Sequence, residues 1–282
     1  MIRIVDWNVS YQGNSKAKIG LLKKITNELG EGYPCIIAMQ EVTESIHFDI
    51  TRDDIFSNYA YSLNLRSPGQ YEERNRSLGC LVACTGGIKI IDSSLIDRAP
   101  FPERTLCVHA RLGQIVFEIV CFHSLTGVGF KKAKSAQFAA LADYLSLKQG
   151  KPAILCCDLN EPQIDHYDLS RVKLFDQQGD GGLAASYILG NSPVHGLRDT
   201  YRVWLTKNPE KLRKIKEMQD LSEDLASTPM QISHLAGSKN AKRYDYIFCS
   251  EHWEVNHVEY RFQEAINVGS DHALVTADLE WK

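Results

Sequence analysis

An acid and an amide stand two residues apart at the end of a short apolar run, in the order Asp158-Leu-Asn160. In an extended chain this spacing places both side chains on one face, where they can hold the same ligand. A carboxylate beside a neutral hydrogen-bond donor suits the activation of water next to an anionic phosphate. The alternative is a capped turn, in which Asp and Asn only accept bonds from nearby backbone N–H groups.

Other apolar runs in the chain also carry a polar residue at one end. Those that follow a run are Asn8, Glu41, His123, Asp158 and Asn160, and those that precede one are Asp245, Asp271 and His272. If the last strands run antiparallel to the others, their starts share an edge with the others' ends. We therefore expect all eight side chains to gather at one rim of the sheets.

Such a rim combines carboxylates, amides and two histidines without a thiolate at ligand spacing. Hard oxygen donors suit Mg²⁺ or Mn²⁺ better than zinc, and Glu41 is the expected ligand. A purely structural role for each of these residues stays open. Asn8 and Asn160 can be turn residues, Asp271 can cap a turn, and Asp245 can pair on the surface with a neighbouring cation. Asp6 shares a strand face with Asn8, so it can support the site from behind the residues that act there, but solvation at the surface is the plainer expectation.

The hydrophobic pattern predicts strands that alternate irregularly with a few helices. The expected strands are 2–9, 35–40, 59–65, 78–84, 88–91, 105–111, 115–123, 153–158, 244–250, 253–260 and 273–279, and the expected helices are 16–29, 131–147 and 209–225. Many neighbouring strands read as antiparallel hairpins. This pattern favours two packed sheets flanked by helices in one domain, residues 1–282, with a long loop over 161–192.

Composition narrows the class of protein. The 282 residues carry a net charge of −3, so attraction of a polyanion must come from a local basic surface or a metal ion. The eight cysteines lie mostly in apolar runs and form no Cys-x-x-Cys pair, which predicts buried reduced thiols. The sequence opens on a strand and has no run of 18 apolar residues, so we expect a cytoplasmic protein without a membrane span.

Six short motifs occur in one order along nearly the whole chain. They are Trp7-Asn8, Gln40-Glu41-Val42, Phe122-His123-Ser124, Asp158-Leu-Asn160, Arg243-Tyr-Asp245-Tyr-Ile247 and Ser270-Asp271-His272. In these motifs the chain resembles the endonuclease/exonuclease/phosphatase superfamily. The resemblance implies a four-layer α/β (α+β) sandwich of two mixed β-sheets flanked by helices, and cleavage of phosphate esters with a divalent metal. A segment from Arg104 through His123 to the 131–144 helix is similar to the tyrosyl-DNA phosphodiesterase branch.

The resemblance implies a metal site and a catalytic group. Glu41 is then the chief ligand of Mg²⁺ or Mn²⁺, and Asn8 and Asp271 lie close to the ion or its waters. The implied catalytic residues are Asp158, Asn160, His272, His123 and Asp245.

Their implied roles differ. Asp158 orients or deprotonates the attacking water, and Asn160 holds the nucleophile or a phosphate oxygen. His272 contacts the non-bridging oxygens, while Asp245 fixes its tautomer. His123 contacts the phosphate or assists the leaving oxygen.

Basic residues with interleaved aromatics indicate where a substrate binds. Candidates are Arg74, Arg76 and Lys131, whereas the lysines of 207–216 read as a solvated helix face. A nuclease acting on DNA or RNA is the first hypothesis. The alternatives are a phosphatase or phosphodiesterase of small esters, of the inositol phosphate or sphingolipid type, and a non-catalytic binding module of the same fold. The oligomeric state is left open.

Overall fold

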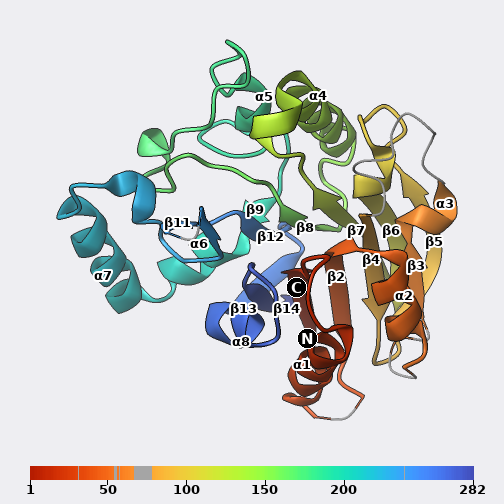
Figure 1. Ribbon diagram of the computed structural model, residues 1–282. Coiled ribbons are helices and arrows are strands. Elements are labelled where there is room, and N and C mark those ends of the chain that lie inside the picture. Colours follow the sequence, from red (N-terminus) through yellow and green to blue (C-terminus); the bar gives the residue numbers. More distant parts are fainter. Residues whose placement is uncertain (31, 54–55, 57, 67–77, 238) are drawn as a thin grey trace.

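The computed structural model describes residues 1–30, 32–53, 56, 58–66, 78–237 and 239–282. Within these residues two mixed six-stranded sheets stack face to face (Figure 1). The first has the order β13-β14-β1-β2-β4-β3, and the second has the order β5-β6-β7-β8-β12-β9. The predicted sandwich of two mixed sheets flanked by helices is confirmed.

The elements have the following bounds. The first sheet contains β1 Ile2–Asn8, β2 Cys35–Val42, β3 Tyr59–Tyr61, β4 Gly79–Cys84, β13 Trp253–Arg261 and β14 Leu274–Trp281. The second contains β5 Lys89–Leu95, β6 Thr105–Leu112, β7 Ile115–His123, β8 Ala153–Asp158, β9 Arg198–Asp199 and β12 Asp245–Cys249. A separate hairpin consists of β10 His234–Ala236 and β11 Asn240–Lys242. The helices are α1 Ser15–Asn27, α2 Glu44–Thr51, α3 Ser62–Leu65, α4 Gly127–Ser146, α5 Leu183–Ser186, α6 Thr200–Thr206, α7 Pro209–Asp220 and α8 Phe262–Asn267.

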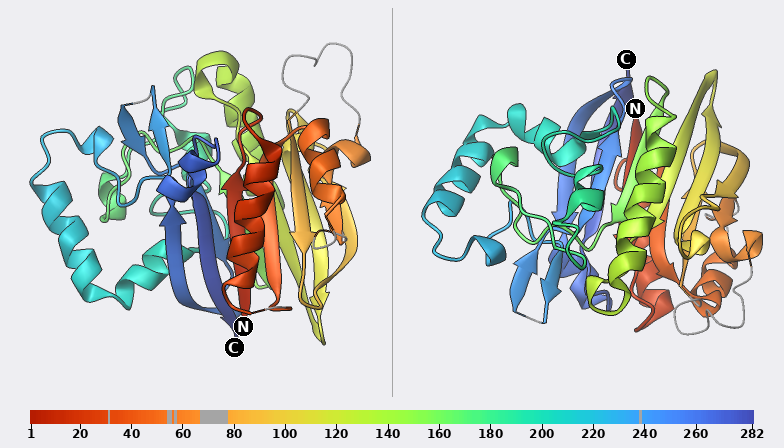
Figure 2. Two further views of the ribbon diagram at one scale, coloured as in Figure 1. Left: turned by 60° about the horizontal axis from the view of Figure 1, so that its bottom comes forward. Right: turned by 90° about the horizontal axis from the view of Figure 1, so that it is seen from above.

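Alternating side chains divide the interior into three apolar layers. On β1, Ile2 and Ile4 point between the sheets, whereas Val5 and Trp7 point outward against the helix layer of α1 and α2. The outer face of the second sheet packs on α4 and α5, for example through Phe138. Figure 2 shows α1 across one outer face in its left view and α4 across the other in its right view. The result is a four-layer arrangement, helices–sheet–sheet–helices.

Strand direction decides which ends of the strands meet. β1 pairs in parallel with β2, and β7 pairs in parallel with β8, so these four strands end at one rim. β12 runs antiparallel to β8, with Asp245 directly opposite Asp158. β14 runs antiparallel to β1, so the two termini lie side by side at the opposite end of the first sheet (Figure 2). The expected meeting of strand starts and strand ends is therefore confirmed.

One expected strand was wrong in its extent. The strand expected over 59–65 ends at Tyr61, because the chain turns there into α3 and the Ser62 hydroxyl accepts a bond from the Cys80 N–H at 2.8 Å. The 161–192 segment is mostly irregular as expected, but it contains α5 and the 3₁₀ turn Leu169–Arg171. None of the described helices has the length and apolar run that crossing a bilayer requires.

All eight cysteines are free and buried, as their apolar surroundings predict. Burial raises the pKa of the Cys35 thiol to about 11 and that of the Cys107 thiol to about 12. Because the thiolate is the reactive species, we expect none of the eight thiols to react quickly with Ellman's reagent at pH 8 in the native protein, and all eight to react in urea. A rapidly reacting thiol in the native protein would contradict this placement.

Candidate active site

The inter-sheet faces of four strands, β1, β7, β8 and β12, converge at the rim. Asn8, His123, Asp158 and Asp245 each follow the alternation of their strand and point between the sheets, and each is buried. His123 lies beside Asp158 in the parallel pairing of β7 and β8. The eight predicted residues thus come from both sheets, and side-chain contacts connect seven of them, all but Asp271, into one cluster.

Asp158 is at the centre of this cluster. Its Oδ2 accepts a hydrogen bond from Asn8 Nδ2 at 3.0 Å, and its Oδ1 accepts one from the backbone N–H of Asn160 at 3.0 Å. The Asn160 amide also lies 3.4 Å from Asp158 Oδ2 and 3.3 Å from the Ser124 carbonyl oxygen. Asn160 has a left-handed backbone, with φ of +47°, which is strained for a residue other than glycine. The turn considered above as the alternative is present, and it holds the Asn160 side-chain amide against the Asp158 carboxylate.

Asp245 and His272 form a buried pair next to Asp158. His272 Nδ1 lies 2.9 Å from Asp245 Oδ2, and its Nε2 lies 3.9 Å from Asp158 Oδ2. Burial opposes the charged imidazole, but the carboxylates of Asp245 and Asp158 outweigh it and raise the pKa of His272 to about 10. Asp245 does not pair with the neighbouring Arg243 at the surface, which was the alternative considered above. Arg243 instead bonds Asp199 at 2.7 Å.

His123 is held differently. Arg104 Nη1 lies 3.2 Å from His123 Nδ1 and 3.4 Å from its Nε2. That nitrogen lies 3.6 Å from both Glu41 Oε1 and Asp158 Oδ2. Burial, then the charges of Arg104 and His272, keep the pKa of His123 well below its ordinary value. The rim therefore contains one charged and one neutral histidine.

Glu41 is the half-buried carboxylate at the open side of the rim. Its backbone is left-handed, with φ of +58°, where the pairing of β2 with β4 shifts register between Met39 and Val42. Such an irregularity redirects a side chain at the end of a strand. Glu41 Oε2 accepts the Tyr11 N–H at 3.1 Å, and its other oxygen faces His123.

The charge of the rim fits a divalent cation. Asp6 is fully buried, contrary to the solvated position expected for it, because the second sheet covers that face of β1. Burial raises the pKa of Asp6 well above its ordinary value, and repulsion from Asp245 and Asp158 adds to the shift. Burial also raises the pKa of Asp158 to about 7, although His272 partly offsets it. Several hard carboxylate oxygens forced together in this way are the donor set that Mg²⁺ or Mn²⁺ prefers.

Two groups of ligand atoms lie close enough to share an ion. One is Asp158, Asp245 and His272, and the other is His234, Asp271 and His272, each with its atoms within 4.8 Å of one another. Glu41 belongs to neither group, but lies on the far side of His123. Asp271 is exposed on the turn before β14, and its backbone oxygen lies 3.1 Å from His234 Nδ1.

The predicted substrate residues have different positions. Lys131 is exposed near the start of α4 and lines a groove beside the rim. Arg74 and Arg76 lie outside the described residues. On α7, Arg213 pairs with Glu217 at the surface and Ile215 faces inward, which supports the expected solvated face. Figure 1 places α7 at the periphery of the molecule.

Three residues at the site were not among the predicted site residues. His234 stacks on His272 with ring centroids 4.3 Å apart, and Arg104 fixes His123. Lys134 is buried on α4, where its ammonium donates to the Asn160 carbonyl oxygen at 2.7 Å. Lys134 stands in the Lys131-Lys-Ala-Lys134 run, and only its place on the inner helix face separates it from its exposed neighbours.

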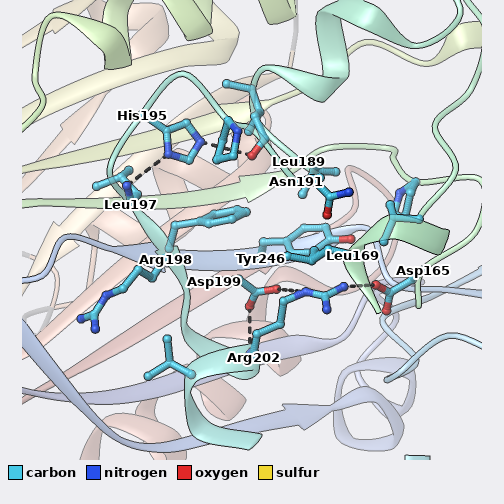
Figure 3. Close-up of a pocket in the computed structure, with 17 residues that line it drawn as sticks. Asp165, Leu169, Leu189, Asn191, His195, Leu197, Arg198, Asp199, Arg202 and Tyr246 are labelled. Atoms are coloured by element: carbon cyan, nitrogen blue, oxygen red, sulfur yellow. Dashed lines mark hydrogen bonds and ion pairs between the residues drawn. The ribbon is translucent and has the colours of Figure 1, made fainter. Parts of the chain in front are cut away.

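A pocket of about 270 Å³ lies on the outer face of β12, next to Tyr246 and Phe248 (Figure 3). Alternation along β12 places these two rings on the face opposite Asp245, so the pocket is separated from the rim by the sheet. Its charges are paired with one another, as shown by Arg202 against Asp165 and Asp199 in Figure 3. We therefore assign the chemistry to the rim.

No protein-family model matches the sequence, and no curated protein matches it either. Solved structures do match over almost the whole chain. The endonuclease/exonuclease/phosphatase protein of Bacteroides vulgatus is 15% identical with a TM-score of 0.58, over 99% of this chain and 98% of that one. The chain has the endonuclease/exonuclease/phosphatase fold.

Other structures with this fold are similar to the same degree. An AP endonuclease from Archaeoglobus fulgidus is 14% identical with a TM-score of 0.58, over 99% of this chain and 100% of that one. The human Nocturnin catalytic domain, with a bound sulfate anion, is 18% identical with a TM-score of 0.57, over 100% and 94%. At these identities the likeness is one of fold, and the rim is interpreted from its own geometry.

Proposed function

We propose that this protein is a divalent-metal-dependent phosphodiester hydrolase, and more narrowly a nuclease that cleaves DNA or RNA. The observation that carries the proposal is the continuous contact from Glu41 through His123 and Asp158 to His272. This contact combines a half-buried carboxylate at the open side of the rim, a buried base and a charged imidazole. These are the parts that attack of water on a phosphate requires.

We assign the metal to Glu41, with Asn8 and Asp271 close to the ion or its waters. A bound divalent cation neutralises charge on a phosphate oxygen and so lowers the barrier to attack. The half-buried position of Glu41 supports this assignment, because its Oε1 has only the 3.6 Å contact with His123 among the described interactions.

Each side chain of the rim has a separate role in the reaction. Asp158 takes a proton from the attacking water, and the Asn160 amide holds that water or a phosphate oxygen. The new P–O bond forms as the bond to the leaving oxygen breaks. His272 stabilises the charge that develops on the non-bridging oxygens, and Asp245 keeps it charged and oriented. His123, kept neutral by burial and by the nearby charges, contacts the phosphate or assists the leaving oxygen.

The first test is a substrate panel in magnesium, with and without a chelator. We expect hydrolysis of bis-(p-nitrophenyl) phosphate and of an oligonucleotide, and loss of both activities in the chelator. Single-stranded, double-stranded, abasic and 5′-tyrosyl DNA, RNA and inositol phosphates form the arms of the panel. Hydrolysis of inositol phosphates alone would replace the nuclease with a small-ester phosphatase.

Glu41→Gln tests the metal assignment. Removing the negative charge of the ligand should lower activity at least about 100-fold and raise the magnesium concentration needed for half-maximal activity. Glu44→Gln is the matched control, because Glu44 is exposed on α2 three residues later. If Glu41→Gln lowered activity without changing the magnesium dependence, Glu41 would not be the ligand.

A further inference from the structure

A groove of about 450 Å³ opens next to the rim and shares a wall with it. Its lining includes Asn160, His234, Tyr244, Phe175, Lys131 and Gln178, and we name it the Phe175 groove. Asn160 belongs to the candidate catalytic cluster, and His234 stacks on His272. A molecule whose phosphate lies at the rim can therefore extend directly into this groove.

Three aromatic rings line the groove, those of Phe175, His234 and Tyr244. His234 stacks between Tyr244 and His272, with centroids 5.7 Å and 4.3 Å away. The half-buried ring of Phe175 has the Lys134 ammonium 5.7 Å and the Lys242 ammonium 6.0 Å from its centroid. Because Tyr244 is buried and His234 already stacks on Tyr244 and His272, the half-buried Phe175 is the ring left for a flat ligand. Such rings bind the faces of nucleobases, which stack on them whatever the base.

The groove is built by contacts that hold its wall in place. The Phe175 N–H donates to Glu161 Oε2 at 2.9 Å, and Glu161 pairs with Lys134 at 2.8 Å. Further along the chain from Phe175, Asp180 accepts a hydrogen bond from the Ser135 hydroxyl at 2.5 Å. Part of the 161–192 segment, whose role the sequence left open, is thereby fixed to α4.

The charges of the groove distinguish among substrates. Among the described lining residues, Lys131 is a cation without a hydrogen bond or ion pair, whereas Lys134 is occupied by Glu161 and the Asn160 carbonyl oxygen. Asp176 adds a carboxylate, whose Oδ1 accepts the Gly179 and Gly181 N–H groups. An inositol polyphosphate needs several free cations and would be repelled by Asp176. A nucleotide needs one cation for its phosphate, ring faces for its base, and acceptors such as Asp176 and Gln178 for the base edge.

We propose that the Phe175 groove binds the nucleotide next to the scissile phosphate, with its base stacked on Phe175 and its phosphate near Lys131. The volume lies within the range of sites for single small ligands. A base can stack on a side chain only when it has left the duplex, so the substrate class is single-stranded or locally unpaired nucleic acid. This inference rests on the proposed function and adds the substrate class.

Binding is measured in the Asp158→Asn background with magnesium, so that the metal is present and cleavage does not compete. The probes are fluorescent single-stranded DNA and RNA of about 12 nucleotides, with fluorescence anisotropy as the readout. Phe175→Ala should weaken binding of either probe about 5- to 150-fold, the range found for loss of one stacked base. Phe175→Leu keeps an apolar side chain in the groove wall but removes the aromatic ring, so it should also weaken binding of the probes. Lys131→Gln should weaken binding and flatten its salt dependence.

Two variants serve as matched controls and should bind like the parent. Phe48→Ala removes another half-exposed ring that lies beside a cation, with Arg52 4.2 Å from its centroid. Lys132→Gln removes the exposed lysine adjacent to Lys131, which is not among the groove's lining residues. Thermal unfolding of each variant checks that it is folded.

Failure of this inference and failure of the proposed function give different results. In otherwise unaltered protein, Phe175→Ala should lower kcat/KM for the oligonucleotide by a larger factor than kcat/KM for bis-(p-nitrophenyl) phosphate, which has no nucleobase. If both phenylalanine variants bind the probes like the parent while the unaltered protein cleaves oligonucleotides, the groove assignment is wrong and the nuclease stands. If the unaltered protein hydrolyses neither compound, the proposed function fails. Tighter binding of duplex than of single strands would also overturn the assignment.

Discussion

Asp158→Asn should reduce metal-dependent hydrolysis by about 100- to 10,000-fold, the range that positioned proton transfer contributes. The reason is geometric. Asp158 is held by Asn8 and the Asn160 N–H, and both histidines approach the same oxygen, Oδ2, at 3.6 Å and 3.9 Å. Asparagine has nearly the same shape but cannot accept a proton from water. Initial rates with bis-(p-nitrophenyl) phosphate and with an oligonucleotide provide the measurement.

The same substitution should leave the fold intact. Asp92→Asn, an exposed residue on β5, controls for the chemical change and should keep full activity. In the metal-free protein the raised pKa of Asp158 has a consequence of known sign. Between 3.8 and about 7 the folded chain holds a proton that the unfolded chain has released, so this carboxyl makes stability fall as pH rises through that window. Asp158→Asn should remove this contribution to the fall in stability with rising pH. If the variant retained activity, Asp158 would not be the catalytic base.

Arg243→Met should lower the free energy of unfolding by about 3–5 kcal/mol, the cost of removing one partner of a buried ion pair. Arg243 is buried, and its Nη2 lies 2.7 Å and 2.8 Å from the two oxygens of Asp199. Its Nε donates to the Tyr260 hydroxyl at 2.9 Å, and three tyrosine rings surround the guanidinium. Asp199 would remain largely buried, and among the described residues its remaining cationic partner is Arg202 at 3.5 Å.

Urea denaturation followed by tryptophan fluorescence gives the measurement. Arg213→Met is the control, because Arg213 pairs with Glu217 on the exposed face of α7 and such surface pairs contribute about 0.3–0.5 kcal/mol. Equal losses in the two variants would show that the Arg243–Asp199 pair contributes no more than a surface ion pair. The pair also supports the site, since the Tyr260 hydroxyl donates to the backbone oxygen of Asp245.

Much of the rim could be predicted from the sequence, because the signals are local. A polar residue after a buried strand is visible in a few letters, as at His123 and Asp158, and the alternation of each strand fixes which face it occupies. The main helices could be recognised in the same way. In α4 a kink at Phe130 separates a short first turn, from Gly127, from the regular helix that follows it, which begins where the sequence predicts. Glu41 was predicted as a ligand because it follows an apolar run. Neither its left-handed backbone nor the register shift beside it is visible in the sequence.

The sequence by itself determined the chemistry of the rim: which residue types stand at strand ends, and in what order. Tertiary structure decided everything that depends on partners distant in the chain. The burial of Asp6 requires the second sheet, the Arg243–Asp199 pair joins residues 44 apart, and the Phe175 groove needs α4, the 161–192 segment and β10 together. Local periodicity reports which way a side chain points, whereas burial and charge pairing depend on what packs against it. For this reason Asp158-Leu-Asn160 indicated attack on a phosphate, and only the groove beside it indicates which phosphate.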